Sequence, residues 1–328
     1  MPFLTRLFLL VCLFSLVTST CLADAAFTQQ PDVQKFIKSM VKEHGFKKTE
    51  LDTLFSSVKM RPKIIQQFKA PLEEQPWYLY ERLFVNEWRI QQGLIFWRKN
   101  AQSLALAEKK YGVPASIIVA TLGIETKYGQ RIGEHRVLDA LCNLAFIKSK
   151  RAPFFRHELE EFLLLSRENH LDPNRVMGSY AGAIGQPQFM PSSYRYFAVN
   201  FAGKGKVDLI NNTNDAISSI GNYYKEHGWQ ANQPVAVPAA LLGNVNQFTA
   251  KKTLTSSDLA KYGIVNGGEY QSQKIFAVKL IELKDYRDKQ YWLGFHNFSV
   301  IKRYNPSDLY AMAVFQLSHH LSTLKGKS

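Results

Sequence analysis

The fold of this chain is organised around one apolar stretch, Ala120-Thr121-Leu122-Gly123-Ile124-Glu125-Thr126-Lys127-Tyr128-Gly129. It follows Tyr111-Gly112-Val113-Pro114, in which the glycine suits the end of one helix and the proline suits the first turn of the next. Nearly every side chain between Pro114 and Ile124 is apolar, and a helix that is apolar on all sides is buried. We therefore predict a buried central helix that ends at Gly129.

Glu125 is the only acidic residue of this predicted helix, and it lies at the C-terminal end. Taking a carboxyl group out of water raises its pKa, and that brings the group into the range of a general acid. A second interpretation makes Glu125 a structural residue, paired with Lys127, Arg131 or a more distant arginine. The stretch alone leaves both interpretations open.

Residues 1–25 have the organisation of a secretory signal peptide. Arg6 precedes an apolar run, and Ala23-Asp24-Ala25 supplies the small residues of a cleavage site. The apolar run is too short to span a membrane. A lipid anchor on Cys21 is the alternative, but Thr18 and Thr20 stand where the bacterial lipoprotein pattern requires a leucine and a small glycine or alanine. We therefore predict a soluble periplasmic protein rather than an outer-membrane lipoprotein.

Composition narrows the class of partner. The net charge of +14 favours an anionic partner, and export to the periplasm argues against nucleic acid. Peptidoglycan, with its lactyl and peptide carboxylates, satisfies both conditions. Cleavage after Ala25 leaves Cys142 as the only cysteine, so we expect no internal disulfide. Cys142 lies in an apolar helical pattern and is predicted to be a buried small hydrophobic residue.

The expected secondary structure changes along the chain from helices to a small sheet. Helical patterns begin at Pro31 and Thr49, a pattern from Glu87 continues to Tyr111, and three prolines predict an irregular segment at 60–76. Further helices are expected over 153–170 and 215–227, the first with His157-Glu158 and Glu160-Glu161 on a solvated face. Residues 233–296 alternate and are rich in β-formers, which predicts a small antiparallel sheet before a last helix begins at Ser307.

A glycine-rich segment, residues 178–194, has three glycines within eight residues, which permits close approach of backbone to a ligand. Its spacing fits neither a dinucleotide-binding loop nor the G-x-S-x-G turn of a hydrolase. Ser179 and Gln188 supply the uncharged hydrogen bonds that sugar hydroxyls and acetamides require. The segment is therefore a candidate saccharide-binding loop.

The sequence predicts no metal site, because its histidines are scattered and no H-E-x-x-H motif occurs. Residues 200–209 have the rhythm of a calcium-binding EF-hand loop. The third and fifth positions of that loop are Ala202 and Lys204, where oxygen ligands are required. We predict that no calcium binds and that Lys204 partly occupies the place of the ion.

Several segments together resemble the lytic murein transglycosylase B family, and the resemblance covers most of the chain after the signal segment. They are Ile124-Glu125-Thr126 with Tyr128-Gly129, Lys150-Arg151-Ala152, residues 178–194, Asn222-Tyr223 with His227-Gly228-Trp229, and Arg303-Tyr304-Asn305 with Ser307, Tyr310 and Ala311. The resemblance implies a mainly α (α+β) fold: a lysozyme-like helical core, a helical N-terminal domain, and a small antiparallel β domain inserted before the C-terminal helix. Together with the signals above it predicts a signal peptide at 1–25 and domains at 26–111, 112–232 and 233–296, with 297–328 returning to the core.

The resemblance also implies an activity, cleavage of the β-1,4 bond between N-acetylmuramic acid and N-acetylglucosamine in peptidoglycan. In such enzymes one glutamate, matched here by Glu125, protonates the leaving oxygen. It then takes the proton of the sugar's own 6-hydroxyl, which closes a 1,6-anhydro ring. The family has a calcium loop, and this sequence departs from it at Ala202 and Lys204, so we predict no metal and no cofactor. The matching substrate-binding residues are Arg151, for a muramyl or peptide carboxylate, and Ser179, Gln188, Tyr223, Tyr304, Asn305 and Tyr310 along the saccharide groove.

Two alternatives stay open beside this transglycosylase. One is a muramidase that hydrolyses the same bond, and the other is a non-catalytic peptidoglycan-binding scaffold. Peptidoglycan glycan strands are the expected partner, cell-wall synthesis or hydrolysis complexes are considered as further partners, and we expect a monomer.

Overall fold

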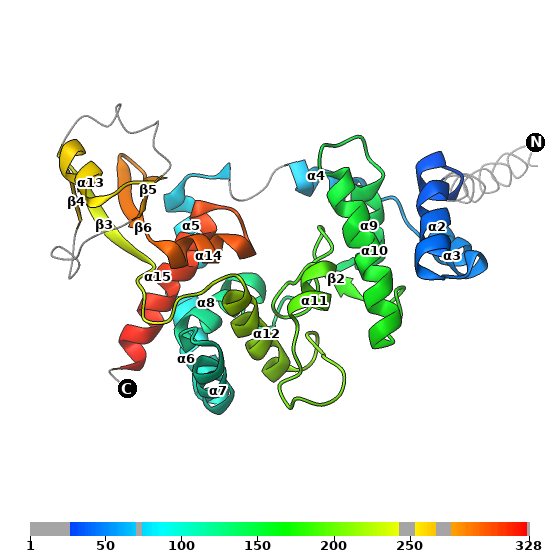
Figure 1. Ribbon diagram of the computed structural model, residues 1–328, viewed down its shortest axis with the longest axis horizontal. Coiled ribbons are helices and arrows are strands. Elements are labelled where there is room, and N and C mark those ends of the chain that lie inside the picture. Colours follow the sequence, from blue (N-terminus) through cyan, green and yellow to red (C-terminus); the bar gives the residue numbers. More distant parts are fainter. Residues whose placement is uncertain (1–26, 70–73, 243–252, 267–276, 327–328) are drawn as a thin grey trace, which may run out of the picture. The chain divides into compact units, whose positions relative to one another are not determined.

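The computed structural model describes residues 27–69, 74–242, 253–266 and 277–326 (Figure 1). The predicted signal peptide and the predicted strand at 248–250 lie outside these residues. The chain divides into two compact units: unit 1 is residues 1–69, 133–184 and 189–195, and unit 2 is residues 70–132, 185–188 and 196–328. Within the described residues the fold is mainly helical with small antiparallel sheets, as predicted. The proposed domain limits near residues 111, 232 and 296 stay a prediction.

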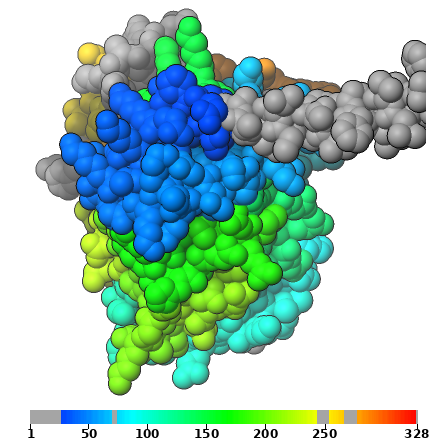
Figure 2. Space-filling view, turned by 90° about the vertical axis from the view of Figure 1, so that its right-hand side faces the viewer, coloured from blue at the N-terminus to red at the C-terminus, as the bar shows by residue number. Residues whose placement is uncertain are grey.

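Unit 1 is built from two groups of helices and one short two-stranded ribbon. Figure 2 shows one face of it, where α2 (Pro31–His44) and α3 (Lys48–Ser56) lie in blue beside green segments of the unit. The second group consists of α4 (Pro62–Lys69), α9 (Val137–Ala145) and α10 (Ala152–Asn169). Strand β1 (His135–Arg136) pairs antiparallel with β2 (Met177–Gly178), and this pairing fixes the start of the glycine-rich segment.

Helix α4 corrects the prediction of an irregular segment at 60–76. Proline at the first turn of a helix costs no hydrogen bond, because the N–H groups there have no partner within the helix. Pro62 stands at that position, so it begins a helix rather than preventing one. Ile64 of this helix is fully buried.

The solvated face predicted for α10 is half wrong: His157 is exposed and the Glu160 side chain is 32% exposed, but Glu158 and Glu161 are only 2% and 3% exposed. Glu158 accepts hydrogen bonds from the backbone N and the Oγ of Ser192, at the start of α11 (Pro191–Phe197). Burial raises the pKa of Glu158, and the two bonds from Ser192 oppose that shift. Glu161 is paired with Arg195 at 2.7 Å. Two buried carboxylates therefore hold α11 against α10.

Unit 2 surrounds the predicted apolar helix, which is α8 (Ala115–Thr126). It packs against α6 (Glu87–Lys99), α7 (Ala101–Tyr111), α12 (Thr213–Glu226) and α15 (Asp308–Lys325). The pattern expected to run from Glu87 to Tyr111 is two helices, because the chain breaks at Asn100, whose Nδ2 donates to the carbonyl of Phe96. Helix α5 (Trp77–Phe84) and α14 (His296–Tyr304) complete the helical part.

The C-terminal helix begins where its sequence predicts. The Oγ of Ser307 accepts hydrogen bonds from the backbone N of Leu309 and Tyr310, which satisfies two free donors of the first turn. Cys142 of unit 1 is fully buried, as expected, and burial raises the pKa of its thiol well above the ordinary value. Among the described residues no helix combines the length and the hydrophobicity that crossing a membrane requires.

In the described part of residues 233–296, the predicted sheet is present as four antiparallel strands with the order β4-β3-β6-β5. Its strands are β3 (Ala236–Leu241), β4 (Ile264–Asn266), β5 (Lys279–Lys284) and β6 (Lys289–Gly294). Val237, Leu254, Leu259, Ile264, Val278 and Leu293 form its core, to which the short helix α13 (Ser256–Tyr262) contributes. Helix α13 was not predicted, although Thr255 and Asp258 form a capping box at its start.

A substitution at Gly133, just before β1, tests the close contact with Gly178 at the start of the glycine-rich segment. A Cβ at this position would lie 2.0 Å from the carbonyl carbon and oxygen of Gly178, and its φ is +109°. Steric overlap and backbone strain together should cost roughly 2–5 kcal/mol in Gly133→Ala. The free energy of unfolding in urea measures this cost.

Gly45→Ala is the matched control in the same unit. Gly45 has a φ of +67°, but no atom lies within 4 Å of the position that its Cβ would take. We expect only the backbone cost of about 1–2 kcal/mol. Equal destabilisation by the two substitutions would contradict the close contact at Gly133.

Candidate active site

Glu125 stands at the end of α8, and it is the only residue of that helix that is not buried. The helix ends at Thr126, three residues before the predicted stop at Gly129. Lys127, Tyr128 and Gly129 then have φ values of 52°, 63° and 85°. Two consecutive non-glycine residues in this left-handed region are unfavourable, so other contacts must hold the turn.

Thr126 supplies two of those contacts. Its Oγ1 donates to the carbonyl of Gln186 at 2.8 Å and accepts a bond from the backbone N of Gly129 at 3.0 Å. Through these bonds the turn after Glu125 is tied to the loop at 185–188, which belongs to the same unit. The orientation of Glu125 is therefore fixed from its C-terminal side.

Tyr128 and Arg89 clamp the last turn of α8 to α6. The Tyr128 hydroxyl donates to the carbonyl of Arg89 at 2.6 Å, and Nη1 of Arg89 donates to the carbonyl of Gly123 at 3.0 Å. A Cβ at Gly123 would lie 2.6 Å from the Tyr128 hydroxyl oxygen, so only glycine allows this approach. Burial lowers the pKa of Arg89 and raises that of Tyr128.

Four tyrosines of unit 2 gather beside Glu125. Tyr310 donates its hydroxyl to Oε1 of Glu125 at 2.5 Å. Tyr304 stacks on Tyr310, with ring centroids 6.2 Å apart and planes 15° apart, and donates to the carbonyl of Pro187 at 2.5 Å. Tyr224 shares a hydrogen bond of 2.9 Å with Thr121, one turn before Glu125 on α8.

Tyr223 closes the group on the side of α14. Its hydroxyl donates to the carbonyl of Arg303 at 2.6 Å, and its ring packs edge-on against Tyr304 at 4.8 Å. The ring of His227 stacks on it at 4.0 Å. The predicted residues Tyr223, Tyr304 and Tyr310 are thus brought together with Glu125.

The charge of Glu125 acts on all four tyrosines. Burial raises the pKa of Tyr304 and of Tyr310 well above the ordinary value, and the carboxylate of Glu125 raises it further. Burial likewise raises the pKa of Tyr223 and Tyr224, and Glu125 adds to the shift in both. Glu125 is the only carboxylate among these causes. The tyrosines therefore keep their protons and act as hydrogen-bond donors around a single acid.

Gln188 and Asn305 are the remaining predicted residues of unit 2. Nε2 of Gln188 donates to the carbonyls of Ile132 and Gly185 at 3.0 and 2.8 Å, so Oε1 is the atom that remains for a ligand. Gln188 also has a φ of 52°. Asn305 follows α14 and accepts a bond from the backbone N of Ser307 at 3.2 Å.

Arg151 and Ser179 belong to unit 1 and are described within it. The Arg151 guanidinium is exposed and lies 5.2–5.3 Å from the ring centroids of Phe68, Phe154 and Phe155. Ser179 begins a tight turn: its Oγ accepts a bond from the backbone N of Ala183 at 3.0 Å. The structure places these two residues in unit 1 and the other predicted site residues in unit 2.

Three residues of the site were not predicted from the sequence: Tyr224, Thr121 and Arg89. Tyr224 directly follows Tyr223, and neighbouring residues of a helix point in different directions, so one motif match did not indicate both. Arg89 lies on α6 among other polar residues, so nothing in the sequence indicated that its side chain is only 5% exposed. A threonine in an otherwise apolar helix was the one signal available for Thr121.

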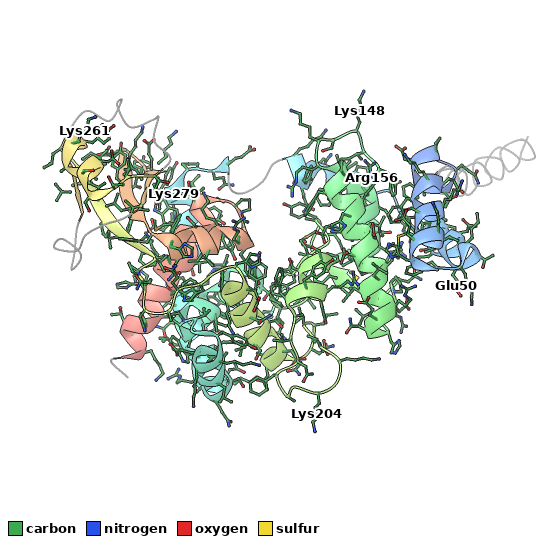
Figure 3. The ribbon with its side chains drawn as sticks, viewed as in Figure 1. Glu50, Lys148, Arg156, Lys204, Lys261 and Lys279 are labelled. Carbon is green, nitrogen blue, oxygen red and sulfur yellow. The ribbon has the colours of Figure 1, made fainter. Side chains whose placement is uncertain are left out.

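The EF-hand-like loop, residues 200–209, is held by hydrogen bonds of its own, which continue to residue 211. Both carboxylate oxygens of Asp215 accept backbone N–H groups, from Phe201 at 2.8 Å and Asp208 at 2.9 Å. Oδ1 of Asp208 accepts bonds from Ile210 and Asn211, and Oδ1 of Asn200 accepts one from Lys204. The loop is closed by these bonds. Lys204 is exposed and points away from the loop, so its predicted place at the ion position is wrong (Figure 3).

In the part of the chain that the structure describes, no cluster of three or more histidine, cysteine, aspartate or glutamate side chains is arranged to hold a metal. The expectation that the chain uses no metal stays a prediction.

Residues 28–319 match the family model described as the transglycosylase SLT domain. The chain belongs to this family. It is 39% identical over 306 residues to the membrane-bound lytic murein transglycosylase B of Escherichia coli, which covers 89% of this chain and 82% of the relative. The family that the sequence resembles is thereby confirmed: the chain is a member of the lytic murein transglycosylases.

Solved structures agree with this fold. The soluble lytic transglycosylase SltB1 of Pseudomonas aeruginosa superposes with a TM-score of 0.82 at 39% identity, over 90% of this chain and 100% of that one. Escherichia coli Slt35, solved with bulgecin A and with calcium, gives TM-scores of 0.84 and 0.83 at 37% identity, over 91% of this chain and 95% of that one. The lysozyme-like fold class is confirmed.

Calcium gives a direct test of the loop at 200–211 of this transglycosylase. We expect millimolar calcium to leave the melting temperature unchanged, because the loop oxygens are already bonded. Asp215→Asn should lower stability by about 1–3 kcal/mol with or without calcium, because one acceptor of a buried N–H becomes a donor. A saturable rise in melting temperature with calcium would show that the loop binds the ion.

The tyrosine group predicts how the stability of the transglycosylase depends on pH. Tyr224 has a pKa raised above 10 by burial, so above pH 10 the unfolded chain loses a proton that the folded chain keeps. The native state then binds more protons than the unfolded state, and the free energy of unfolding falls as pH rises. Urea unfolding between about pH 9 and pH 11 should show a shallower fall in Tyr224→Phe.

Tyr286→Phe is the control for this experiment, since Tyr286 is 71% exposed. That variant should follow the slope of the unmodified chain. Identical slopes in all three proteins would mean that Tyr224 does not hold its proton more tightly in the folded state.

Proposed function

We propose that this chain is an exported lytic transglycosylase that cleaves the β-1,4 bond between N-acetylmuramic acid and N-acetylglucosamine in peptidoglycan. Glu125 is the single acid and base, and the product carries a 1,6-anhydro-N-acetylmuramic acid end. One contact carries the assignment of Glu125: the hydrogen bond from Tyr310 to its Oε1, at the one residue of α8 that is not buried.

In the first step Glu125 donates its proton to the glycosidic oxygen while the bond from that oxygen to the anomeric carbon breaks. Tyr310 donates its hydroxyl to Oε1 and so holds the carboxyl group in place for this transfer. In the second step the 6-hydroxyl of the muramyl residue attacks the anomeric carbon and gives its proton to the same carboxylate. One C–O bond is broken and one is formed, and no water is consumed.

A solitary carboxylate supports this route over hydrolysis. Most glycosidases use two carboxyl groups, one as the acid and one to activate water or to attack the sugar. Among the described residues, Glu125 is the only carboxylate that contributes to the pKa shifts of the four tyrosines. An attack by the sugar's own hydroxyl needs no second carboxylate and gains from proximity.

The proposed substrate contacts are Gln188, Tyr223, Tyr304, Asn305 and Tyr310 in unit 2, with Ser179 and Arg151 in unit 1. The hydroxyls of Tyr223 and Tyr304 already donate to backbone carbonyls, so these residues would meet the sugar with their rings and with hydroxyl lone pairs. Gln188 would accept a hydroxyl or acetamide N–H through Oε1. Arg151, exposed on three phenylalanine rings, suits a carboxylate.

The proposal places the enzyme in the periplasm, on glycan strands, after cleavage of a signal peptide at residue 25. One relative is named membrane-bound and another soluble, so the family provides for both forms. The sequence around Cys21 favours the soluble form. Complexes of cell-wall synthesis or hydrolysis are further candidate partners of a monomeric enzyme, whose proposed domains are 26–111, 112–232 and 233–296 with the segment 297–328.

The test is Glu125→Gln on purified sacculi, read by mass analysis of the released muropeptides. Glutamine keeps the size of the side chain and an acceptor for Tyr310, but it cannot carry the proton. We expect release of anhydro-muropeptides to fall by at least about a thousandfold, since acid and base catalysis are both lost, while the melting temperature stays within a few degrees. Glu108→Gln, an exposed glutamate of α7, is the control and should keep full activity.

The outcomes separate the alternatives. Anhydro products from Glu125→Gln at the unmodified rate would remove Glu125 from the mechanism. Products of the unmodified chain that carry an added water would identify a hydrolytic muramidase. Binding of sacculi with no turnover by the unmodified chain would indicate a scaffold protein.

A further inference from the structure

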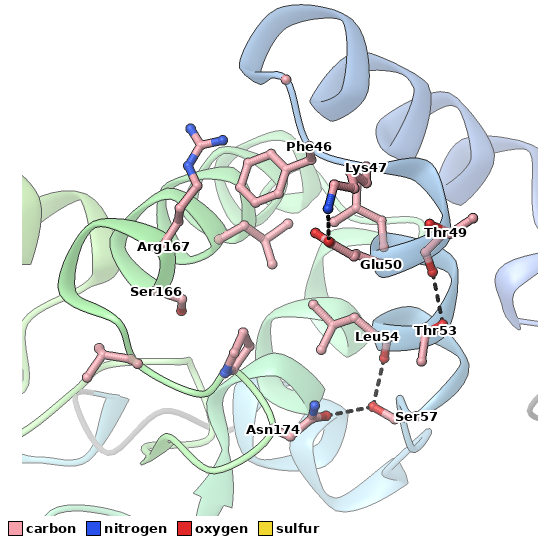
Figure 4. A pocket seen from close by; sticks show the side chains of 15 residues that line it. Phe46, Lys47, Thr49, Glu50, Thr53, Leu54, Ser57, Ser166, Arg167 and Asn174 are labelled. Atoms are coloured by element: carbon pink, nitrogen blue, oxygen red, sulfur yellow. Dashed lines mark hydrogen bonds and ion pairs between the residues drawn. The ribbon is translucent and has the colours of Figure 1, made fainter.

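Unit 1 contains a pocket that the proposed chemistry does not use. Its volume is about 820 Å³, and it lies between residues 45–57, of α3 and the loop before it, and residues 163–174, at the end of α10 and in the loop after it (Figure 4). This volume is within the range of sites for small molecules and short peptides. All of its residues belong to unit 1, whereas Glu125 and its tyrosines belong to unit 2.

The walls of the pocket are aliphatic and aromatic. They are formed by Phe46, Leu51, Leu54, Leu163, Leu171 and Pro173. Ser166 also lines the pocket; it is 3% exposed, and its enclosed Oγ has no hydrogen-bond partner in the described part of the chain. The walls therefore suit a ligand with small aliphatic groups.

The polar groups at the rim are mainly donors. The Arg167 guanidinium lies 4.3 Å from the centroid of the Phe46 ring and gives Nη1 to the carbonyl of His44. It makes no ion pair with a carboxylate in the described residues. Its exposed position leaves the other N–H groups directed to solvent, and a guanidinium fork matches a carboxylate.

Asn174 adds a second donor across the pocket from Arg167. Its Oδ1 accepts a bond from Ser57 Oγ at 2.9 Å (Figure 4). It accepts another from Arg136 Nη1 at 3.1 Å, and the two bonds orient the amide. No described residue accepts a bond from Nδ2, which remains for a ligand. The oriented amide and the guanidinium thus offer two separate contacts to an anionic molecule.

Glu50 is the one acidic side chain of the pocket, and it is paired with Lys47 at 3.0 Å. Both side chains are well exposed, at 77% for Lys47 and 62% for Glu50, so the pair is weak and its two members can separate. The rim therefore carries Arg167 as an unneutralised cation beside a neutral pair, which favours an anion.

We propose that this pocket binds the carboxylate-bearing stem peptide of peptidoglycan, at a site separate from the catalytic residues. Such a peptide combines the methyl groups of alanine with several carboxylates, which matches aliphatic walls under a rim of donors. The identity of the peptide rests on the proposed function. The pocket holds a peptide of the wall while the glycan strand is cut elsewhere on the enzyme.

The experiment measures binding of a sugar-free tetrapeptide, L-alanyl-γ-D-glutamyl-meso-diaminopimelyl-D-alanine, by calorimetry. The protein is the exported chain carrying Glu125→Gln, so that no turnover contributes. We expect saturable binding that is lost when the carboxylates of the peptide are amidated. Because the probe has no glycosidic bond, the result is independent of whether the proposed cleavage occurs.

Two variants test the rim. Arg167→Gln removes the cation, and Asn174→Asp keeps the acceptor for Ser57 and Arg136 but replaces the Nδ2 donor by a carboxylate oxygen. Each should weaken binding by about tenfold or more, since a charge-assisted or oriented bond to a carboxylate is lost. Arg156→Gln is the matched control: Arg156 is on the same helix and also donates to a backbone carbonyl, that of Ala145, but it does not line the pocket (Figure 3).

The proposal is overturned if the unmodified pocket shows no saturable binding. It is also overturned if Arg167→Gln and Asn174→Asp bind as tightly as Arg156→Gln. Binding that survives both rim variants but is lost in Arg151→Gln would place the peptide at Arg151 instead. Melting temperatures of all variants establish that a loss of binding is not a loss of fold.

Discussion

The exclusion of α8 from water is the constraint on which unit 2 depends. Four helices, α6, α7, α12 and α15, pack on it, and every residue except Glu125 is buried. Burying a leucine or isoleucine side chain contributes roughly 1.5–3 kcal/mol, so a helix of this composition has no stable alternative at the surface. Glu125, the one carboxylate of α8, lies at its end, and the helices packed around α8 fix its position.

This arrangement explains why so much of the site could be predicted from one stretch of sequence. The apolar run identifies α8, and its single acid identifies Glu125. Ser307 identifies the start of α15 by its capping chemistry, and three residues later Tyr310 reaches Glu125. Such features are local: a few neighbouring residues determine them, so they can be predicted without knowing which distant residues they contact. The sheet is a similar case, because alternation of side chains is a local property.

The wrong predictions concern residues whose structure depends on a contact with a residue far away in the sequence. Glu158 and Glu161 are charged and regularly spaced, as on a solvated face, but Ser192 and Arg195 bury them. The stop of α8 at Thr126 rather than Gly129 depends on Thr126 bonding to Gln186, sixty residues away. In the loop at 200–211 the sequence showed that calcium ligands are missing. It did not show that Asp215 accepts the backbone N–H groups of the loop, because Asp215 belongs to the following helix.

The position of the Tyr128 side chain limits which substitutions this sequence tolerates. The hydroxyl of Tyr128 occupies the space that a side chain at position 123 would need, and it touches the backbone of α6 at Arg89. Substitutions at these positions are therefore not independent: alanine at 123 is excluded while the ring is present and becomes tolerable once a smaller residue replaces it. Divergent members of the family are expected to exchange these residues as a set, because an intermediate with only one exchange would lose the turn that follows the acid.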